Sequence, residues 1–95
     1  MRYITNMIIW DEHKNTKLKL ERNISFEQIA DIILEENYID ILEHKKNQNQ
    51  LIFVVELNDY IYAVPFIFDE YDNIVLKTAF PSRKLMKKYR GKNET

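Results

Sequence analysis

Apolar and polar positions follow a helical period between Ser25 and Glu35. The apolar positions at this spacing are Phe26, Ile29, Ala30, Ile33 and Leu34. Such a stripe predicts an amphipathic helix that turns one face toward the protein core. Ser25 and Gln28, at the start of the stripe, have the spacing of a capping box. In this motif the side chain of each residue accepts a hydrogen bond from the backbone amide of the other. We therefore expect this helix to begin directly after Ser25.

The residues before this helix predict a short strand and a second, more polar helix. Met7 to Trp10 is a brief apolar run, which we interpret as a strand or an extended segment that packs Trp10 into the core. Asp11 follows as an N-cap, because its carboxylate can accept hydrogen bonds from the free amides of a first helical turn. A helix from there to about Glu21 has only Leu18 and Leu20 as aliphatic residues, so it should pack through a narrow face.

After Asn37 the pattern changes to runs that are rich in Ile, Val, Phe and Tyr and separated by short polar stretches. The runs are Tyr38 to Leu42, Leu51 to Leu57, Asp59 to Phe68 and Asn73 to Phe80. They predict four strands, and short connections favour antiparallel neighbours, so we expect a four-stranded antiparallel meander. Pro65 has no N–H to donate to a neighbouring strand, and we expect it at a bulge or on an unpaired side of its strand.

The last segment predicts a third helix and completes the fold class. Ser82 can cap a helix from Arg83 to about Tyr89, and Gly91 would end it. The predicted order is β-α-α-β-β-β-β-α, an α+β fold in which helices cover one face of the sheet. A chain of 95 residues can build one core, so we expect a single domain over residues 1–95.

Composition removes several classes of protein. The chain has no cysteine, which excludes disulfides, thiolate metal sites and thiol nucleophiles. Its longest apolar stretch, Ile61 to Phe68, is far shorter than the roughly 20 residues that cross a bilayer. The first residues lack the apolar core of a signal peptide. We expect a cytoplasmic protein with no membrane partner.

Charge is segregated along the chain although its net value is only -1. Residues 77–92 contain seven cations and no acid, whereas residues 27–43 contain six acids and no cation. A concentrated cationic segment can bind a polyanion, and phosphate backbones are the most common polyanion in a cell. The alternative is a solvated, charge-rich C-terminal helix.

Two blocks of the sequence resemble a known family. Residues 10–15 (WDEHKN) followed by residues 24–30 (ISFEQIA) are similar to the N-terminal signature of the BrnT family of type II toxins. That family resembles RelE in fold, and its members are ribonucleases that arrest growth and are held inactive by a cognate antitoxin. The resemblance implies a RelE-like fold, RNA as the target, free or on the ribosome, an antitoxin partner and a dimer formed through the antitoxin complex.

The chain departs from the family pattern at two places. Where the family has a Lys-His-Gly turn, this chain has Glu21-Arg22-Asn23, and where the last strand of the family runs Ser-Ala-Arg-Lys-Ala, it has residues 77–82 (KTAFPS). The latter run is similar to the end of the sheet in other RelE-like nuclease toxins. Three interpretations stay open: a toxin that cleaves mRNA, an inactive scaffold that binds a protein partner, and a nucleic-acid binder without chemistry.

Metal-independent RNA cleavage requires a base for the 2′-hydroxyl and fixed cations for the charge on the phosphorane. We expect Lys77 and Ala79 on one face of the last strand, and Thr78 and Phe80 on the other. If the helices cover the face of Thr78 and Phe80, Lys77 lies on the open side of the sheet, where Arg83 and Arg22 could join it. Glu21 could serve as the base, with a solvated glutamate as the alternative. The candidate catalytic residues are Lys77, Arg83, Arg22 and Glu21.

Further residues are candidates for holding RNA. Cations supply the electrostatic contacts. The aromatics of the strand Asp59 to Phe68 could stack on bases or belong to the core, and Tyr62 is the one that best suits an exposed position. The candidate RNA-binding residues are Lys84, Lys87, Lys88, Tyr62 and Lys14. For each cation, ordinary surface charge is the alternative. Neither of the two histidines, His13 and His44, has a carboxylate three or four residues further on to complete a zinc site, so we predict no metal and no cofactor. An acidic helix or tail of the antitoxin is expected to cover the basic end.

Overall fold

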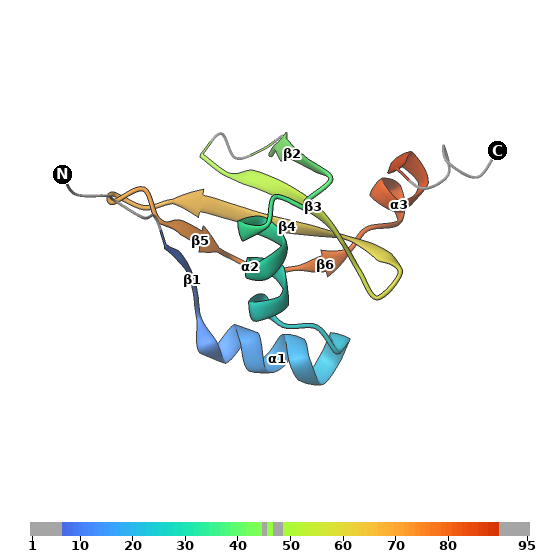
Figure 1. Cartoon of the computed structure of the whole chain (residues 1–95), viewed down its shortest axis with the longest axis horizontal. Coiled ribbons are helices and arrows are strands. Elements are labelled where there is room, and N and C mark those ends of the chain that lie inside the picture. Colours follow the sequence, from blue (N-terminus) through green and yellow to red (C-terminus); the bar gives the residue numbers. More distant parts are fainter. Residues whose placement is uncertain (1–6, 45, 47–48, 90–95) are drawn as a thin grey trace.

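One mixed β-sheet and three helices make up the part of the chain that the structure, a computed structural model, describes: residues 7–44, 46 and 49–89 (Figure 1). The helices are α1 (Glu12–Arg22), α2 (Phe26–Leu34) and α3 (Arg83–Tyr89). The strands are β1 (Ile8–Trp10), β2 (Asp40–Glu43), β3 (Leu51–Leu57), β4 (Tyr60–Phe68), β5 (Ile74–Leu76) and β6 (Phe80–Pro81). The α+β class and the order of the predicted elements are confirmed.

The sheet has the strand order β1-β5-β4-β3-β2, and β6 pairs with β4 beside β5. Strands β2 to β5 form the predicted antiparallel meander. The segment before α1 is a strand, and it pairs with β5 in parallel. The sheet therefore has two strands in addition to the meander. One is β1 at the edge of the sheet, and the other is β6, because the predicted last strand is divided into β5 and β6.

A β-bulge divides that last strand. Phe66 of β4 pairs with Leu76, whereas Ala63 pairs with Phe80, so the register changes by one residue and Thr78 and Ala79 together lie opposite Val64. Pro65 lies beside this point. The Lys77 amide donates to the Pro65 carbonyl at 2.9 Å, but proline has no N–H to return a bond to the Lys77 carbonyl. The expectation of a bulge at Pro65 is confirmed.

The main core lies between the sheet and the first two helices. Four of the five apolar residues of the predicted α2 stripe are buried on the side of β3, β4 and β5, with Phe26 and Ile29 at 0% exposure, whereas Leu34 is 66% exposed. Trp10 of β1 lies over Phe26, with ring centroids 5.8 Å apart. The capping box at Ser25 and Gln28 is present as predicted.

The third helix covers the other face of the sheet. Ile61 and Ala63 of β4 point away from the main core and are nevertheless buried, because α3 packs on β4 on that side. The Tyr89 hydroxyl of α3 donates to Asp40 Oδ2 at 2.8 Å and so joins the helix to β2. The expectation that helices cover only one face is therefore wrong. In the described residues, no helix is long and apolar enough to cross a membrane.

Candidate active site

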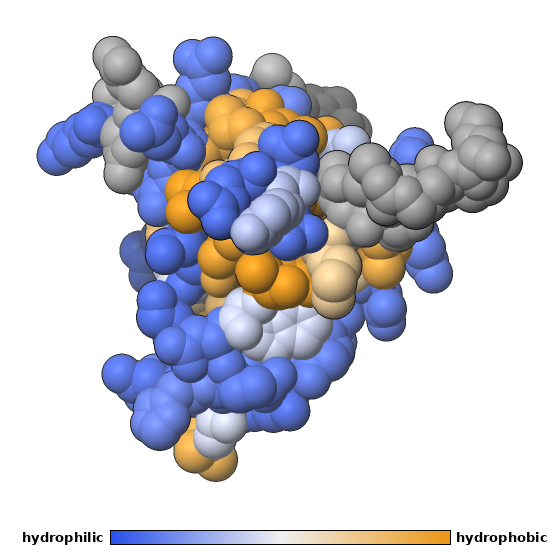
Figure 2. Space-filling view, turned by 90° about the vertical axis from the view of Figure 1, so that its left-hand side faces the viewer, coloured by the Kyte–Doolittle hydropathy of each residue, from blue (hydrophilic) through white to orange (hydrophobic). Residues whose placement is uncertain are grey.

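One face of α1 carries most of the functional candidates. Lys14, Leu18 and Arg22 are spaced four residues apart and therefore lie on one side of the helix. Leu18 is buried at 4% exposure and anchors this face in the core, while the two cations extend past it toward the sheet. The helix ends at Arg22 and is capped by Asn23, whose φ of 57° is left-handed, so Arg22 lies in the last turn. Figure 2 shows hydrophilic side chains over the end of the molecule where α1 runs.

Two hydrogen bonds hold this face of α1 against the bulge. Arg22 Nη1 donates to the Ala79 carbonyl at 2.8 Å, and Lys14 Nζ donates to the Lys77 carbonyl at 3.3 Å. The second bond uses the carbonyl that Pro65 leaves without a partner in the β-ladder. The bulge and the proline thus explain why two cations of a helix can bond to a strand that is already part of a sheet.

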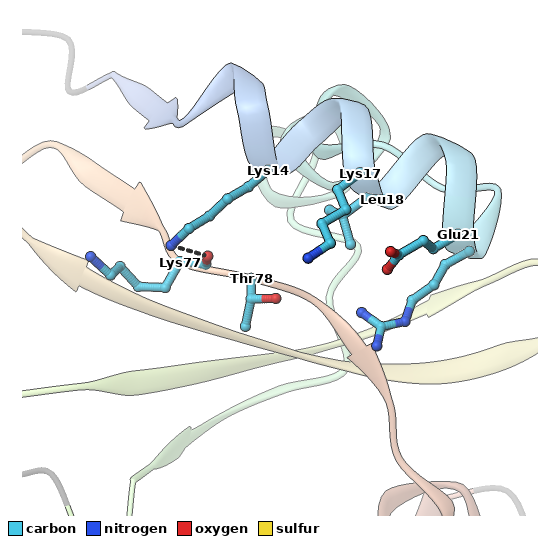
Figure 3. Close-up of a pocket in the computed structure, with 7 residues that line it drawn as sticks. Lys14, Lys17, Leu18, Glu21, Lys77 and Thr78 are labelled. Carbon is cyan, nitrogen blue, oxygen red and sulfur yellow. Dashed lines mark hydrogen bonds between the residues drawn. The ribbon is translucent and has the colours of Figure 1, made fainter.

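Between α1 and the bulge lies a hollow of about 350 Å³, which we call the α1 hollow (Figure 3). Its lining residues are Lys14, Lys17, Leu18, Glu21, Arg22, Lys77 and Thr78. The Lys17 ammonium and the Glu21 carboxylate both extend into the space between the helix and the strand. Among the described residues, neither group has a hydrogen bond or an ion pair. The α1 hollow therefore offers an excess of positive charge and one carboxylate to a ligand.

The structure brings four of the predicted residues together. Lys14, Glu21 and Arg22 of α1 line the α1 hollow together with Lys77, which lies more than 50 residues further along the chain. Lys77 contributes its carbonyl, whereas its ammonium extends along the strand and away from Lys17 (Figure 3). The expected alternation of residues 77–80 is wrong: Ala79 is fully buried in the main core with Leu76, because the bulge changes which side chains face the helices.

The remaining candidates lie elsewhere. Arg83, Lys84, Lys87 and Lys88 are exposed on α3, on the other face of the sheet, and none of them lines the α1 hollow. The expected convergence of Arg83 with Arg22 and Lys77 is therefore wrong. Tyr62 is only 7% exposed and belongs to the main core, so its candidacy for base stacking is wrong and the alternative of a core residue holds. Whether the α3 lysines bind RNA stays a prediction.

Sequence reasoning missed three residues at this end of the molecule. Lys17 and Thr78 line the α1 hollow, and the helical spacing of Lys14, Lys17 and Glu21 could have placed Lys17 there. Asn15 is the third, a fully buried polar residue. It joins the two sequence blocks that carry the family resemblance, because its Nδ2 donates to Glu27 Oε1 at 2.8 Å. This bond is the main reason why the pKa of Glu27 is lowered from its ordinary value.

Within residues 7–44, 46 and 49–89, no three His, Asp or Glu side chains form a group that could hold a metal ion. No protein-family model matches the sequence, and a search of curated proteins found no similar sequence.

Among solved structures, the chain is similar to the ribonuclease toxin BrnT of Brucella abortus. The two chains share 20% sequence identity with a TM-score of 0.62, over 82% of this chain and 97% of that toxin. At this identity the likeness concerns the fold, and membership of the family stays a prediction. The chain has a BrnT-like fold.

Proposed function

We propose that this protein is the toxin of a type II toxin–antitoxin pair, an endoribonuclease that acts in the cytoplasm and cleaves mRNA without a metal. The observation that carries the proposal is the α1 hollow, in which Lys17 and Glu21, both without a partner in the part of the chain that the structure describes, lie beside Arg22. The fold shared with a ribonuclease toxin supports the same conclusion. The proposal includes a cognate antitoxin and a dimer formed through the antitoxin complex. The RNA is cleaved either free or on the ribosome.

The chemistry assigns one role to each group. In metal-independent cleavage the 2′-oxygen attacks the adjacent phosphorus, the bond to the 5′-oxygen breaks, and a 2′,3′-cyclic phosphate forms. Glu21 takes the proton of the 2′-hydroxyl, Lys17 and Arg22 neutralise the additional charge on the phosphorane, and an ammonium of the hollow returns a proton to the 5′-oxygen. Lys77, whose ammonium extends along the strand, suits a neighbouring phosphate of the same RNA.

The second candidate function is RNA or protein binding without cleavage. It is favoured by the bonds of Lys14 and Arg22, because both cations already donate to backbone carbonyls of residues 77 and 79. In this case the cations hold α1 to the sheet and do not stabilise a transition state. Lys17 and Glu21 distinguish the two functions. Neither residue has a structural partner among the described residues, so cleavage gives them a role that binding without cleavage does not require.

The test compares the wild-type chain with a chain that lacks these two groups. Expression of the wild type alone should arrest growth, and the purified protein should cleave single-stranded RNA. Lys17→Met and Glu21→Gln should each lower the cleavage rate by about 10²-fold or more while the protein stays folded. Lys19→Met is the matched control, because Lys19 is an exposed cation of the same helix that does not line the hollow.

The outcomes separate the candidate functions. Growth arrest and RNA cleavage that both substitutions abolish would support the endoribonuclease. A wild-type chain that is harmless and leaves RNA intact, but binds RNA with an affinity that falls steeply with salt, would favour binding without chemistry. Cleavage that is unchanged in both variants would exclude the α1 hollow as the active site.

A further inference from the structure

On the face of the sheet opposite the α1 hollow, α3 and β2 border a second depression of about 390 Å³. Its lining residues are Leu42, Glu43, His44, Lys46, Ile52, Lys84, Leu85 and Lys88, and we call it the α3 groove. Leu42 and Ile52 are directly paired across β2 and β3, so their side chains point to the same face. Together with Leu85 they give the α3 groove an apolar floor.

The rim of the α3 groove is cationic. Lys84 and Lys88 are spaced four residues apart on α3, which places both on the side of the helix that borders the groove, and Lys46 lies on the rim as well. Glu43 is the one acid among the lining residues. Lys88 is near Asp40, which attracts it, and lies over the ring of Tyr89 at 5.3 Å from the centroid. These contacts hold the Lys88 end of the rim in place.

We propose that the α3 groove binds an acidic amphipathic segment of a protein partner, with apolar side chains on Leu42, Ile52 and Leu85 and carboxylates beside Lys84 and Lys88. The apolar floor distinguishes this ligand from RNA, whose backbone would leave the leucine and isoleucine side chains without apolar contacts. An anchor buried on apolar residues inside a charged rim is the usual organisation of a protein interface. That this partner is the antitoxin rests on the proposed function; the chemistry of the groove does not.

The position of the groove gives the partner a second role. Because α3 is held to β2 through Tyr89 and Asp40, a segment in the α3 groove contacts both elements and reinforces their attachment. The α1 hollow lies on the other face of the sheet, so this segment leaves the hollow open. Occupation of the groove and occupation of the hollow by RNA are therefore independent contacts.

The test uses the full chain and a defined probe. The probe is an amphipathic peptide of about 15 residues, or four helical turns, with leucines at helical spacing and glutamates elsewhere. The same peptide with lysines in place of the glutamates is the control ligand. Binding is followed by fluorescence anisotropy, and its location by the methyl NMR signals of Leu42, Ile52 and Leu85.

We expect the glutamate peptide to bind, the lysine peptide not to bind, and the three methyl signals to shift. Lys84→Glu combined with Lys88→Glu should weaken binding by about tenfold, since exposed ion pairs contribute modestly and their reversal adds repulsion. Lys17→Glu combined with Lys19→Glu changes the net charge equally, away from the groove, and should weaken binding much less. Circular dichroism confirms that each variant is folded.

Several results would overturn the proposal. They are a glutamate peptide that does not bind, equal binding by both double variants, and methyl shifts produced by single-stranded RNA and not by the peptide. A dimer of the chain that Lys84→Glu and Lys88→Glu dissociate would assign the α3 groove to a second copy. Peptide binding does not depend on RNA cleavage, so a protein without nuclease activity can still confirm the groove, and a failed groove leaves the nuclease proposal intact.

Discussion

The side-chain oxygen of Asn15 accepts a hydrogen bond of 2.7 Å from the backbone amide of Phe26, the first residue of α2. A residue of α1 thereby satisfies an amide that the start of α2 would otherwise leave unpaired. The Asn15 side chain also donates to Glu27, so both of its polar ends are used at 0% exposure. This arrangement fixes the angle between the two helices, and with it the position of α1 over the bulge.

Asn15→Ala should therefore destabilise the protein strongly. The substitution leaves the Phe26 amide buried without an acceptor, which costs about 2 kcal/mol and lowers the melting temperature of a domain of this size by roughly 10 °C. Urea unfolding and calorimetry measure both quantities. Asn37→Ala is the control, because Asn37 is exposed and its side chain bonds, among the described residues, to Glu35 alone. Equal stability of the two variants would show that the buried bond does not hold the helices together.

A second prediction concerns the bulge. Pro65→Ala provides an N–H that can donate to the Lys77 carbonyl, in competition with Lys14. We expect the amide at position 65 to exchange slowly with solvent, as ladder amides do, and α1 to move away from the bulge. Pro81→Ala is the matched control. The Ser82 amide donates to the Ile61 carbonyl, so the ladder bonds alternate and an amide at position 81 would point away from β4. Fast exchange at both positions would contradict our account of the bulge.

The sequence was sufficient for the elements that local rules determine. Ser25 and Gln28 form the predicted capping box, and Pro65 indicated the bulge, because both effects depend on the chemistry of one or two residues. It was insufficient for the direction of side chains beyond the bulge. We expected Ala79 on the same open face as Lys77. One additional residue at the bulge reverses the alternation of side chains, so Ala79 lies in the core.

In the candidate site, too, the sequence was sufficient for some residues and insufficient for others. The sequence indicated the turn at residues 21–23 and Lys77, within the predicted last strand, and the fold brings them together in the α1 hollow. Arg83 was assigned to the same site because it follows the last strand closely. Its position depends on which face α3 covers, and that is decided by long-range contacts such as the bond from Tyr89 to Asp40. Tyr62 was misplaced for the same reason, because α2 covers its face.

The bond between Tyr89 and Asp40 predicts a dependence of stability on pH. The Tyr89 hydroxyl, and then the Ile41 amide, lower the pKa of Asp40 from its ordinary value of 3.8. A carboxyl whose pKa is lower in the folded state stabilises the protein above its ordinary pKa, and this contribution is lost as the pH falls through the lowered value. The bond to Asp40 likewise raises the pKa of Tyr89 above 10.0, so the tyrosine contribution is lost as the pH rises through the raised value.

Tyr89→Phe should therefore lower the urea midpoint at neutral pH, and the difference from the wild type should shrink in strong acid and in strong alkali. An NMR titration should find the pKa of Asp40 raised toward 3.8 in this variant but still below it, because the Ile41 amide continues to donate to Asp40. Tyr71→Phe serves as the control, since Tyr71 is 72% exposed. If Tyr89→Phe left the Asp40 pKa unchanged, the attachment of α3 to β2 would need another explanation.

The last prediction separates the two roles of Arg22. One guanidinium nitrogen donates to the Ala79 carbonyl, and the group has further N–H donors that can face a phosphate in the α1 hollow. A lysine can make either contact but lacks the planar fork that makes both. Arg22→Lys should keep the stability within about 1 kcal/mol of the wild type and lower RNA cleavage by about tenfold, whereas Arg22→Met should lose both. Arg83→Lys is the matched control on α3 and should leave cleavage unchanged. Equal losses for Arg22→Lys and Arg83→Lys would instead place the chemistry on a surface that includes α3.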